Sequence, residues 1–177
     1  MKILHNEDLK KHSTLKIGGK AKNFYIPQSI AELIECLRGI PRPYYLLGNG
    51  SNILINDQKV FENVVLLKEF NRTATQQANQ TFYLGASLPI QQAINFVNAK
   101  GFGGIEYLYS VPTLVGGAIA MNAGRGRKFN QNISDFTVSV DAIDLENLEI
   151  VNFSISQCQF SYRRSIFKDT KRYLITG

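Results

Sequence analysis

Two stretches of this sequence have the apolar spacing of an amphipathic helix, and short apolar runs lie on both sides of each. Residues 30–38 form the first stretch, with Ser29 as its N-cap and Gly39 at its end. The second follows Pro89 and stops at a cluster of glycines. The runs typical of strands are residues 23–26, 44–47, 52–55, 63–67, 81–84, 137–140, 150–153 and 173–176. The chain is therefore predicted to mix strands and helices.

A polar segment, residues 71–80, is rich in Thr, Gln and Asn and is predicted to be an exposed turn or hairpin. It separates a first lobe, residues 1–70, from a second lobe, residues 71–177. The order in the first lobe is strand, helix, strand, loop, strand, strand. A chain of 177 residues in which 44% are hydrophobic is long enough to bury a core.

The net charge of +6 favours anionic partners, which include nucleic acid, membrane surfaces and diphosphate ligands. Charge alone does not choose among them, because the Lys and Arg residues are scattered singly or in pairs, as on any solvated surface. No apolar run is long enough to cross a bilayer, and the first ten residues do not resemble a signal peptide. Cys36 and Cys158 could form a disulfide, but two thiols in a chain without an export signal are more often reduced core residues, as expected here. These features predict a cytoplasmic protein.

The strongest local signal is a loop of two glycines and three small polar residues between apolar runs: Gly48, Asn49, Gly50, Ser51 and Asn52. Glycine lets the backbone approach a ligand, so successive N–H groups can converge on a diphosphate, with the last two side chains as further donors. An ordinary hairpin turn explains the same composition, and the fingerprint Gly-x-Gly-x-x-Gly is missing. The loop is thus a candidate phosphate site with a structural alternative.

Residues 112–124 form a second signal, because almost all of their side chains are small. Pro112 and Thr113 are expected to open a helix whose free N–H groups and positive dipole end suit an anion. Gly116, Gly117 and Ala118 would let a ligand pack against its backbone. Tight packing of the helix on a sheet needs small residues equally well, so both interpretations stay open.

A third segment, residues 160–167, combines aromatic, hydroxyl and basic side chains. Arg163 and Arg164 each present a planar fork that suits a carboxylate or phosphate. A surface salt bridge is the alternative for either arginine. His5 and His12 lie in the polar N-terminal segment and receive no role, and no spacing typical of a metal site or a Ser/His/Asp triad is found.

Taken in chain order, four segments resemble the UDP-N-acetylenolpyruvoylglucosamine reductase family over nearly the whole chain. They are residues 13–21, residues 47–52, residues 104–106 with 111–124, and residues 162–167. The resemblance implies the two-lobed α+β FAD-binding fold of vanillyl-alcohol oxidase and p-cresol methylhydroxylase, with the cofactor stretched between the lobes. It implies FAD contacts at Gly48, Asn49, Gly50, Ser51, Asn52, Val111, Pro112, Thr113, Gly116, Gly117, Ala118, Asn122 and Gly124.

The resemblance also implies a reaction. In the family, NADPH reduces FAD, and the flavin passes hydride to the enolpyruvyl double bond of UDP-N-acetylglucosamine enolpyruvate, which gives UDP-N-acetylmuramate for peptidoglycan synthesis. Arg163 would correspond to the arginine that steadies the substrate carboxylate and the enolate-like charge. Tyr162 lies beside it in the same motif and is the second candidate catalytic residue.

Three departures from the family pattern qualify this expectation. The family's serine proton donor and late glutamate lie in a substrate-binding domain that would begin after Gly177, so this sequence has no counterpart for either. Thr113 stands where a glycine is usual, and its hydroxyl is expected to cap the helix or bond phosphate. Arg125, Gly126 and Arg127 stand where an Ala-Tyr-Gly stretch is common.

We therefore expect an FAD-binding flavoprotein that is incomplete for catalysis alone. The alternative is a non-catalytic FAD-binding module, or a subunit that needs a partner chain or a second copy. A nucleic-acid binder is a third interpretation and predicts a colourless protein with salt-sensitive affinity. It is the least favoured, and neither nucleic acid nor membrane is an expected partner.

Overall fold

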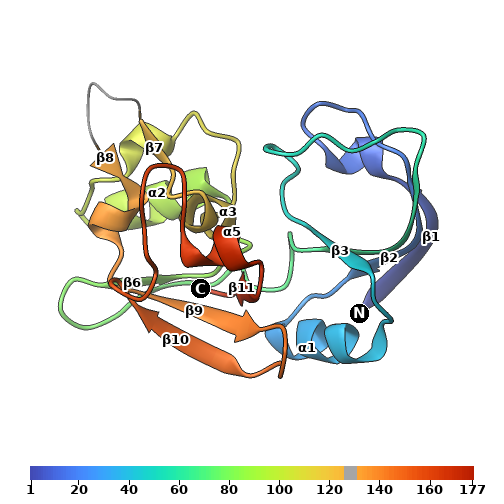
Figure 1. Cartoon of the computed structure of the whole chain (residues 1–177). Helices are drawn as coiled ribbons and strands as arrows, with labels where there is room; N and C mark the ends of the chain where they lie inside the picture. The colour runs from blue at the N-terminus through green and yellow to red at the C-terminus, as the bar shows by residue number, and fades with distance from the viewer. Residues whose placement is uncertain (126–130) are drawn as a thin grey trace. The chain divides into compact units, whose positions relative to one another are not determined.

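The computed structural model describes residues 1–125 and 131–177 and divides the chain into two compact units, Met1–Asn71 and Arg72–Gly177 (Figure 1). Each unit is an α+β structure with its own sheet or sheets. Among the described residues, no helix is long and apolar enough to cross a membrane.

The first unit is built on a four-stranded sheet in the order β1-β2-β4-β3. Strand β1 pairs antiparallel with β2, whereas β2, β4 and β3 are parallel to one another. The elements are β1 (Lys2–Asp8), the 3₁₀ turn η1 (Leu9–His12), β2 (Lys20–Ile26), α1 (Ile30–Gly39), β3 (Tyr44–Leu47) and β4 (Val60–Leu66). Helix α1 connects β2 to β3, as parallel strands require a crossover.

Helix α1 begins where the sequence predicts. The Ser29 side chain accepts a hydrogen bond from the Glu32 N–H at 3.1 Å, and the helix runs to Gly39. Its buried residues, Leu33, Cys36 and Leu37, form one apolar face. Burial raises the pKa of the Cys36 thiol to about 11, so this cysteine is a protonated core residue at neutral pH.

Two parts of the first unit differ from the sequence-based expectation. The expected strand at residues 52–55 is wrong, because these residues lie in an irregular loop between β3 and β4. Since β3 and β4 are neighbouring parallel strands, the loop must carry the chain back along the sheet and is not available for pairing. The N-terminal segment, for which no strand was predicted, forms the edge strand β1.

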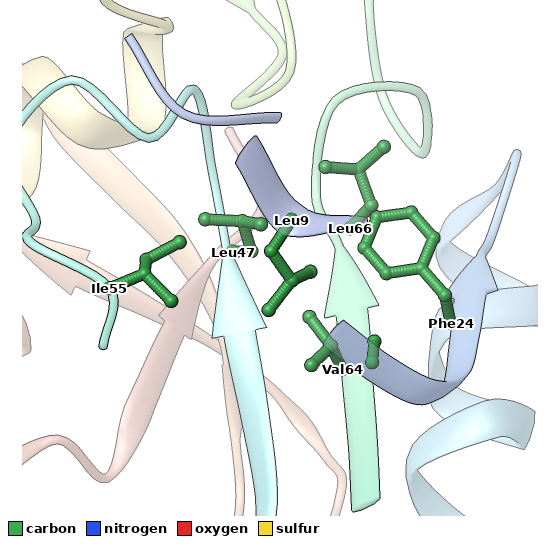
Figure 2. Close-up of a cluster of buried hydrophobic side chains, with 7 residues drawn as sticks. Leu9, Phe24, Leu47, Ile55, Val64 and Leu66 are labelled. Atoms are coloured by element: carbon green, nitrogen blue, oxygen red, sulfur yellow. The ribbon is translucent and has the colours of Figure 1, made fainter. Parts of the chain in front are cut away.

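Side chains from strands and loops meet in the core of the first unit. Figure 2 shows them converging: Leu9, Phe24, Leu47, Ile55, Val64 and Leu66, which are joined by Ala21. Leu9 belongs to η1 and Ile55 to the loop after β3, so the core includes residues outside the sheet. Apolar burial of this kind contributes roughly 25 cal/mol per Å² and therefore holds both irregular segments against the sheet.

The second unit contains the antiparallel sheet β10-β9-β11 and two hairpins, β5-β6 and β7-β8. Its helices α2 and α3 are buried on one side at Ile90, Ala93, Ile94 and Ala118. The elements are β5 (Ala74–Gln76), β6 (Phe82–Leu84), α2 (Ile90–Asn98), η2 (Glu106–Leu108), α3 (Val115–Ala120), β7 (Gly124–Arg125), β8 (Gln131–Asn132), η3 (Ile133–Phe136), β9 (Ser139–Asp144), β10 (Ile150–Ser154), α5 (Ile166–Thr170) and β11 (Tyr173–Ile175).

Helix α3 starts later than the sequence suggests. It begins at Val115 with Leu114 as N-cap, so the expectation that Pro112 and Thr113 open the helix is wrong. The reason is a tertiary contact: the Ile90 N–H donates to the Thr113 carbonyl at 3.0 Å, and Leu114 forms an antiparallel bridge with Pro89. These pairings keep Thr113 outside the helix and hold Leu114 in an extended conformation.

One ion pair ties β9 to the start of β11. The Arg172 guanidinium donates hydrogen bonds to both carboxylate oxygens of buried Asp144, with Nε at 3.0 Å from each. The hydrogen bonds from Arg172 hold the pKa of the Asp144 carboxyl below its ordinary value. The same carboxylate accepts from the Glu146 N–H at 3.0 Å, which shapes the turn between β9 and β10.

We expect Asp144→Asn to reduce the acid sensitivity of the second unit. Because the folded-state pKa is lowered, the stabilisation is complete at neutral pH and is lost as the pH falls below about 4. The variant should be less stable than the wild type at pH 7 and should lose less stability between pH 7 and pH 3. Urea unfolding at several pH values measures this, with the exposed Asp57→Asn as control. Equal pH dependence of Asp144→Asn and the wild type would contradict the assignment.

Candidate functional site

The loop that follows β3, residues 48–59, is packed on the segment that follows η1. Gly50 has φ of 66°, and a Cβ at this position would overlap the His12 carbonyl oxygen. The Thr14 N–H donates to the Gly50 carbonyl at 3.1 Å. Gly50 is buried, so its missing side chain is used by the protein itself.

The far end of the same loop is fixed in the same way. A Cβ on Gly19 would overlap the Lys59 carbonyl oxygen and lie 2.9 Å from that of Asn56. The Lys20 N–H donates to the Lys59 carbonyl at 3.2 Å. Residues 12–20 therefore hold both ends of the loop, and only glycine fits at the two closest approaches.

The supporting segment has its own internal bonds. The buried Ser13 hydroxyl donates to the Ile17 carbonyl at 2.9 Å, and the His12 ring contacts Phe24 with 4.5 Å between centroids. The His12 Nε2 lies 3.0 Å from Glu7 Oε1, and this hydrogen bond is the main cause that lowers the pKa of the Glu7 carboxyl. His12, which received no role from the sequence, thus supports the loop.

Gly48 differs from Gly50. Apart from Gly48 and its two chain neighbours, no residue has an atom within 4 Å of the position that a Cβ on Gly48 would take, so the rest of the protein does not use the space beside it. Ser51 and Asn52 are exposed and follow on the same loop. The arrangement leaves room for a ligand to approach the backbone at Gly48, which is the property that a phosphate-binding loop requires.

In the second unit, the start of α3 is less open than the sequence suggests. The Val115 N–H donates to the Leu88 carbonyl at 2.9 Å, and the Gly116 N–H donates to the Ala86 carbonyl at 3.0 Å. The expectation of free N–H groups is therefore wrong at these two residues. A Cβ on Gly116 would lie 2.9 Å from the Ala86 Cβ, so Gly116 serves the packing that was the alternative interpretation.

Gly117 faces outward. A Cβ there would meet only the Thr113 hydroxyl oxygen, at 2.9 Å, and Gly117 is exposed. The Thr113 hydroxyl donates to the Leu114 carbonyl at 3.1 Å, and α3 has no side-chain cap, so the expected capping by Thr113 is wrong. Pro112 and Gly117 present an exposed edge beside Thr113.

The C-terminal end of α3 is tied to the segment that contains Arg163. Asn122, with φ of 40°, donates from its side-chain nitrogen to the Ser161 carbonyl at 3.0 Å and accepts from the Ser134 N–H at 3.3 Å. The fully buried Ser165 hydroxyl donates to the Ala120 carbonyl at 2.7 Å. Two motifs whose bonded residues lie 39 and 45 positions apart in the sequence are thus joined in space.

Arg163 lies in a tight turn closed by two backbone hydrogen bonds of 3.1 Å between Ser161 and Arg164. It adopts φ of 58°, and its Nη2 donates to the Gly124 carbonyl at 2.8 Å. This bond to a neutral carbonyl orients the guanidinium without neutralising its charge. Tyr162 is 75% exposed at the tip of the turn, and its ring centroid lies 5.8 Å from the Arg163 guanidinium carbon.

The salt-bridge alternative is correct for the neighbouring arginine. Arg164 Nε donates to both carboxylate oxygens of Asp169 at 3.1 Å, and the pair is solvent-exposed. Arg125 is exposed in β7, whereas Gly126 and Arg127 lie outside the described residues. No group of His, Cys, Asp or Glu side chains that could hold a metal ion occurs in residues 1–125 and 131–177.

Comparison with known proteins identifies the fold and relatives. Residues 21–154 match the family described as FAD binding domain. The chain is 36% identical over 177 residues to the UDP-N-acetylenolpyruvoylglucosamine reductase of Carboxydothermus hydrogenoformans, covering 98% of this chain and 57% of that protein. It is 34% identical to the reductase of Chlamydia felis, covering 96% and 56%. The chain therefore spans little more than half the length of these curated relatives.

Comparison with solved structures gives the same family and fold. The crystal structure of UDP-N-acetylenolpyruvylglucosamine reductase from Thermus caldophilus superposes with a TM-score of 0.74 at 26% identity, covering 99% of this chain and 59% of that one. A solvent-stable cholesterol oxidase superposes with a TM-score of 0.60 at 13% identity, covering 86% and 33%, which shows a shared fold. The α+β FAD-binding fold of the vanillyl-alcohol oxidase and p-cresol methylhydroxylase type, expected from the resemblance, is confirmed.

We expect Gly19→Ala to destabilise the first unit by about 2–3 kcal/mol, because the new methyl group overlaps the Lys59 carbonyl oxygen. Gly39→Ala is the matched control, since no atom outside its own stretch of α1 lies within 4 Å of its added Cβ; it should change stability by less than about 1 kcal/mol. Urea unfolding followed by circular dichroism measures both. Equal effects of the two substitutions would contradict the proposed close approach.

We expect Ser165→Ala to lower the stability of the second unit by about 1–2 kcal/mol. The variant loses the bond to the Ala120 carbonyl and the N-cap of α5, where Ser165 accepts from the Lys168 N–H. Thermal unfolding measures the loss, and Ser156→Ala, at an exposed serine, is the control. If both variants unfolded at the wild-type temperature, the hydrogen bond between Ser165 and α3 would make no contribution to stability.

Proposed function

Because the chain belongs to the FAD binding domain family and is homologous to the FAD-binding part of UDP-N-acetylenolpyruvoylglucosamine reductases, we propose that residues 48–52 and 111–124 bind FAD. The observation that carries this proposal is the open space beside Gly48 in a loop held at both ends. Because the loop is already ordered, its backbone can contact a diphosphate without a change of loop conformation on binding.

In the second unit, the edge formed by exposed Pro112 and Gly117 beside half-buried Thr113 supports a contact with FAD. Gly117 has no side chain to block it, and Pro112 is exposed. The other residues of this segment have a structural role in this proposal, because their groups bond or pack within the unit and so hold the edge in shape. They are Val111, Gly116, Ala118, Asn122 and Gly124. The net charge of +6 favours an anionic cofactor.

FAD supplies hydride transfer when bound, with NADPH as the proposed reductant. Arg163 is proposed to hold an anionic group of the substrate, because its side chain is oriented by the Gly124 carbonyl and remains charged. Exposed Tyr162 is proposed to cover the same substrate. An enolpyruvyl ether of a UDP-sugar fits such a group, since its carboxylate matches the guanidinium fork.

A second candidate function asks less of this chain, which spans 57% of the length of the reductase of Carboxydothermus hydrogenoformans. We propose as the alternative an FAD-binding module that works with a partner chain or a second copy. The two proposals differ in substrate reduction, which needs a positioned proton donor that typically contributes about 10²–10⁴-fold.

Three steps with the purified chain separate these functions. Visible absorbance of the protein, after FAD is added and excess removed, tests for the flavoprotein. Anaerobic bleaching by NADPH tests for reduction, and reoxidation by the enolpyruvyl UDP-sugar tests for the complete reaction. A yellow protein that bleaches but is reoxidised only by air supports the module. A protein that stays colourless after incubation with FAD would contradict the proposal.

We expect Gly48→Ala to raise the Kd for FAD by about tenfold or more, which corresponds to roughly 1.4 kcal/mol. The new methyl group enters the space proposed for the diphosphate but meets no residue beyond its two chain neighbours, so the unfolding midpoint should change little. Flavin fluorescence titration measures the affinity, with Gly39→Ala as control. Gly50→Val is less informative, because its side chain would overlap His12 and disturb the unit without any ligand. Wild-type affinity in Gly48→Ala would remove the loop from the site.

A further inference from the structure

The segment proposed to contact FAD in the second unit lies along the residues that lead into α2. The Gly116 N–H bonds the Ala86 carbonyl, the Val115 N–H bonds the Leu88 carbonyl, and the Ile90 N–H bonds the Thr113 carbonyl, at 2.9–3.0 Å. All three bonds join backbone groups, so they do not depend on side-chain identity. They fix the segment from residue 113 onward.

This backbone pairing cannot continue past Ile90, because α2 begins there and its backbone groups turn into the helix. The N–H groups of Gln92 and Ala93 already bond the Pro89 carbonyl. Beyond Ile90, the Gln91 side chain supplies the hydrogen bonds to the segment before Pro112. Its single amide nitrogen donates to the Tyr109 carbonyl and to the Val111 carbonyl, each at 2.9 Å. One side chain thus replaces two backbone donors.

The two bonds determine how the peptide between Val111 and Pro112 is oriented. The Val111 carbonyl also accepts from the Thr113 N–H at 2.8 Å, so both of its lone pairs are occupied. The Val111 N–H in turn bonds the Leu108 carbonyl at 2.9 Å. Without Gln91, one acceptor site of this partly buried carbonyl and the Tyr109 carbonyl would need new partners.

We propose that Gln91 is a positioning residue for FAD, which acts through the orientation of residues 109–113. The proposal rests on the function proposed above. Both N–H bonds of the Gln91 amide are used within the protein, so the residue acts on the cofactor through Val111, Pro112 and Thr113 and not by contact. It fixes the edge before the ligand arrives, which reduces the ordering that binding requires.

The test compares Gln91→Leu, which keeps the bulk and loses the donors, with Gln92→Leu at the exposed neighbouring position. We expect Gln91→Leu to raise the Kd for FAD by about tenfold, to alter the visible spectrum of the bound flavin, and to speed hydrogen exchange at the Val111 and Thr113 amides. Gln92→Leu should change none of these. Gln91→Lys, whose ammonium has donors for both carbonyls, should restore most of the affinity.

Each outcome decides between the two proposals. If the wild type binds FAD and Gln91→Leu binds it equally well, the role of Gln91 is overturned and the proposed function stands. If Gln91→Lys folds but does not restore the affinity, the hydrogen bonds are not the cause and the inference also fails. If the wild type does not bind FAD, both proposals fail. Should Gln91→Leu not fold, Gln91→Glu, which is similar in shape and has no N–H to donate at neutral pH, is measured in its place.

Discussion

Close approach of one backbone segment to another is the constraint on which both units depend. At three glycines, another segment of the same chain comes too close for a Cβ to fit: Gly19, Gly50 and Gly116. These contacts order segments that lack the regular hydrogen bonds of a helix or strand. The loop after β3 keeps its conformation because residues 12–20 hold it at both ends, and α3 keeps its position because Gly116 meets Ala86.

Irregular segments also need partners for their polar backbone groups, since an unpaired buried group costs about 1–3 kcal/mol. A small set of side chains supplies them in this chain. Ser13 bonds the turn before β2, Asn122 and Ser165 join the end of α3 to the Arg163 turn, and Gln91 bonds the segment before Pro112. These side chains hold the shape of the surfaces proposed to bind FAD and substrate.

The glycines of each motif therefore have two different roles. Gly50 and Gly116 are required by the protein's own packing, whereas Gly48 and Gly117 leave space that the protein does not fill or fills only with a hydroxyl group. The sequence shows the four residues as equivalent members of two glycine-rich stretches. Only the second pair provides an argument for a cofactor, and that argument agrees with the FAD binding domain family to which residues 21–154 belong.

Local pattern by itself determined the helices at α1 and α2, the Ser29 cap and most strands. This is possible because the spacing of apolar residues follows the period of the helix or strand that buries them. The order of four short motifs also determined the family and its fold. The start of α3 at Val115, the loop at residues 52–55, the edge strand β1 and the orientation of Arg163 were decided only by tertiary structure. Each depends on a partner that is distant in the sequence, such as Ile90 for Thr113 or Gly124 for Arg163. Residue spacing records which side chains are buried, but it does not record which backbone group a distant segment will bond.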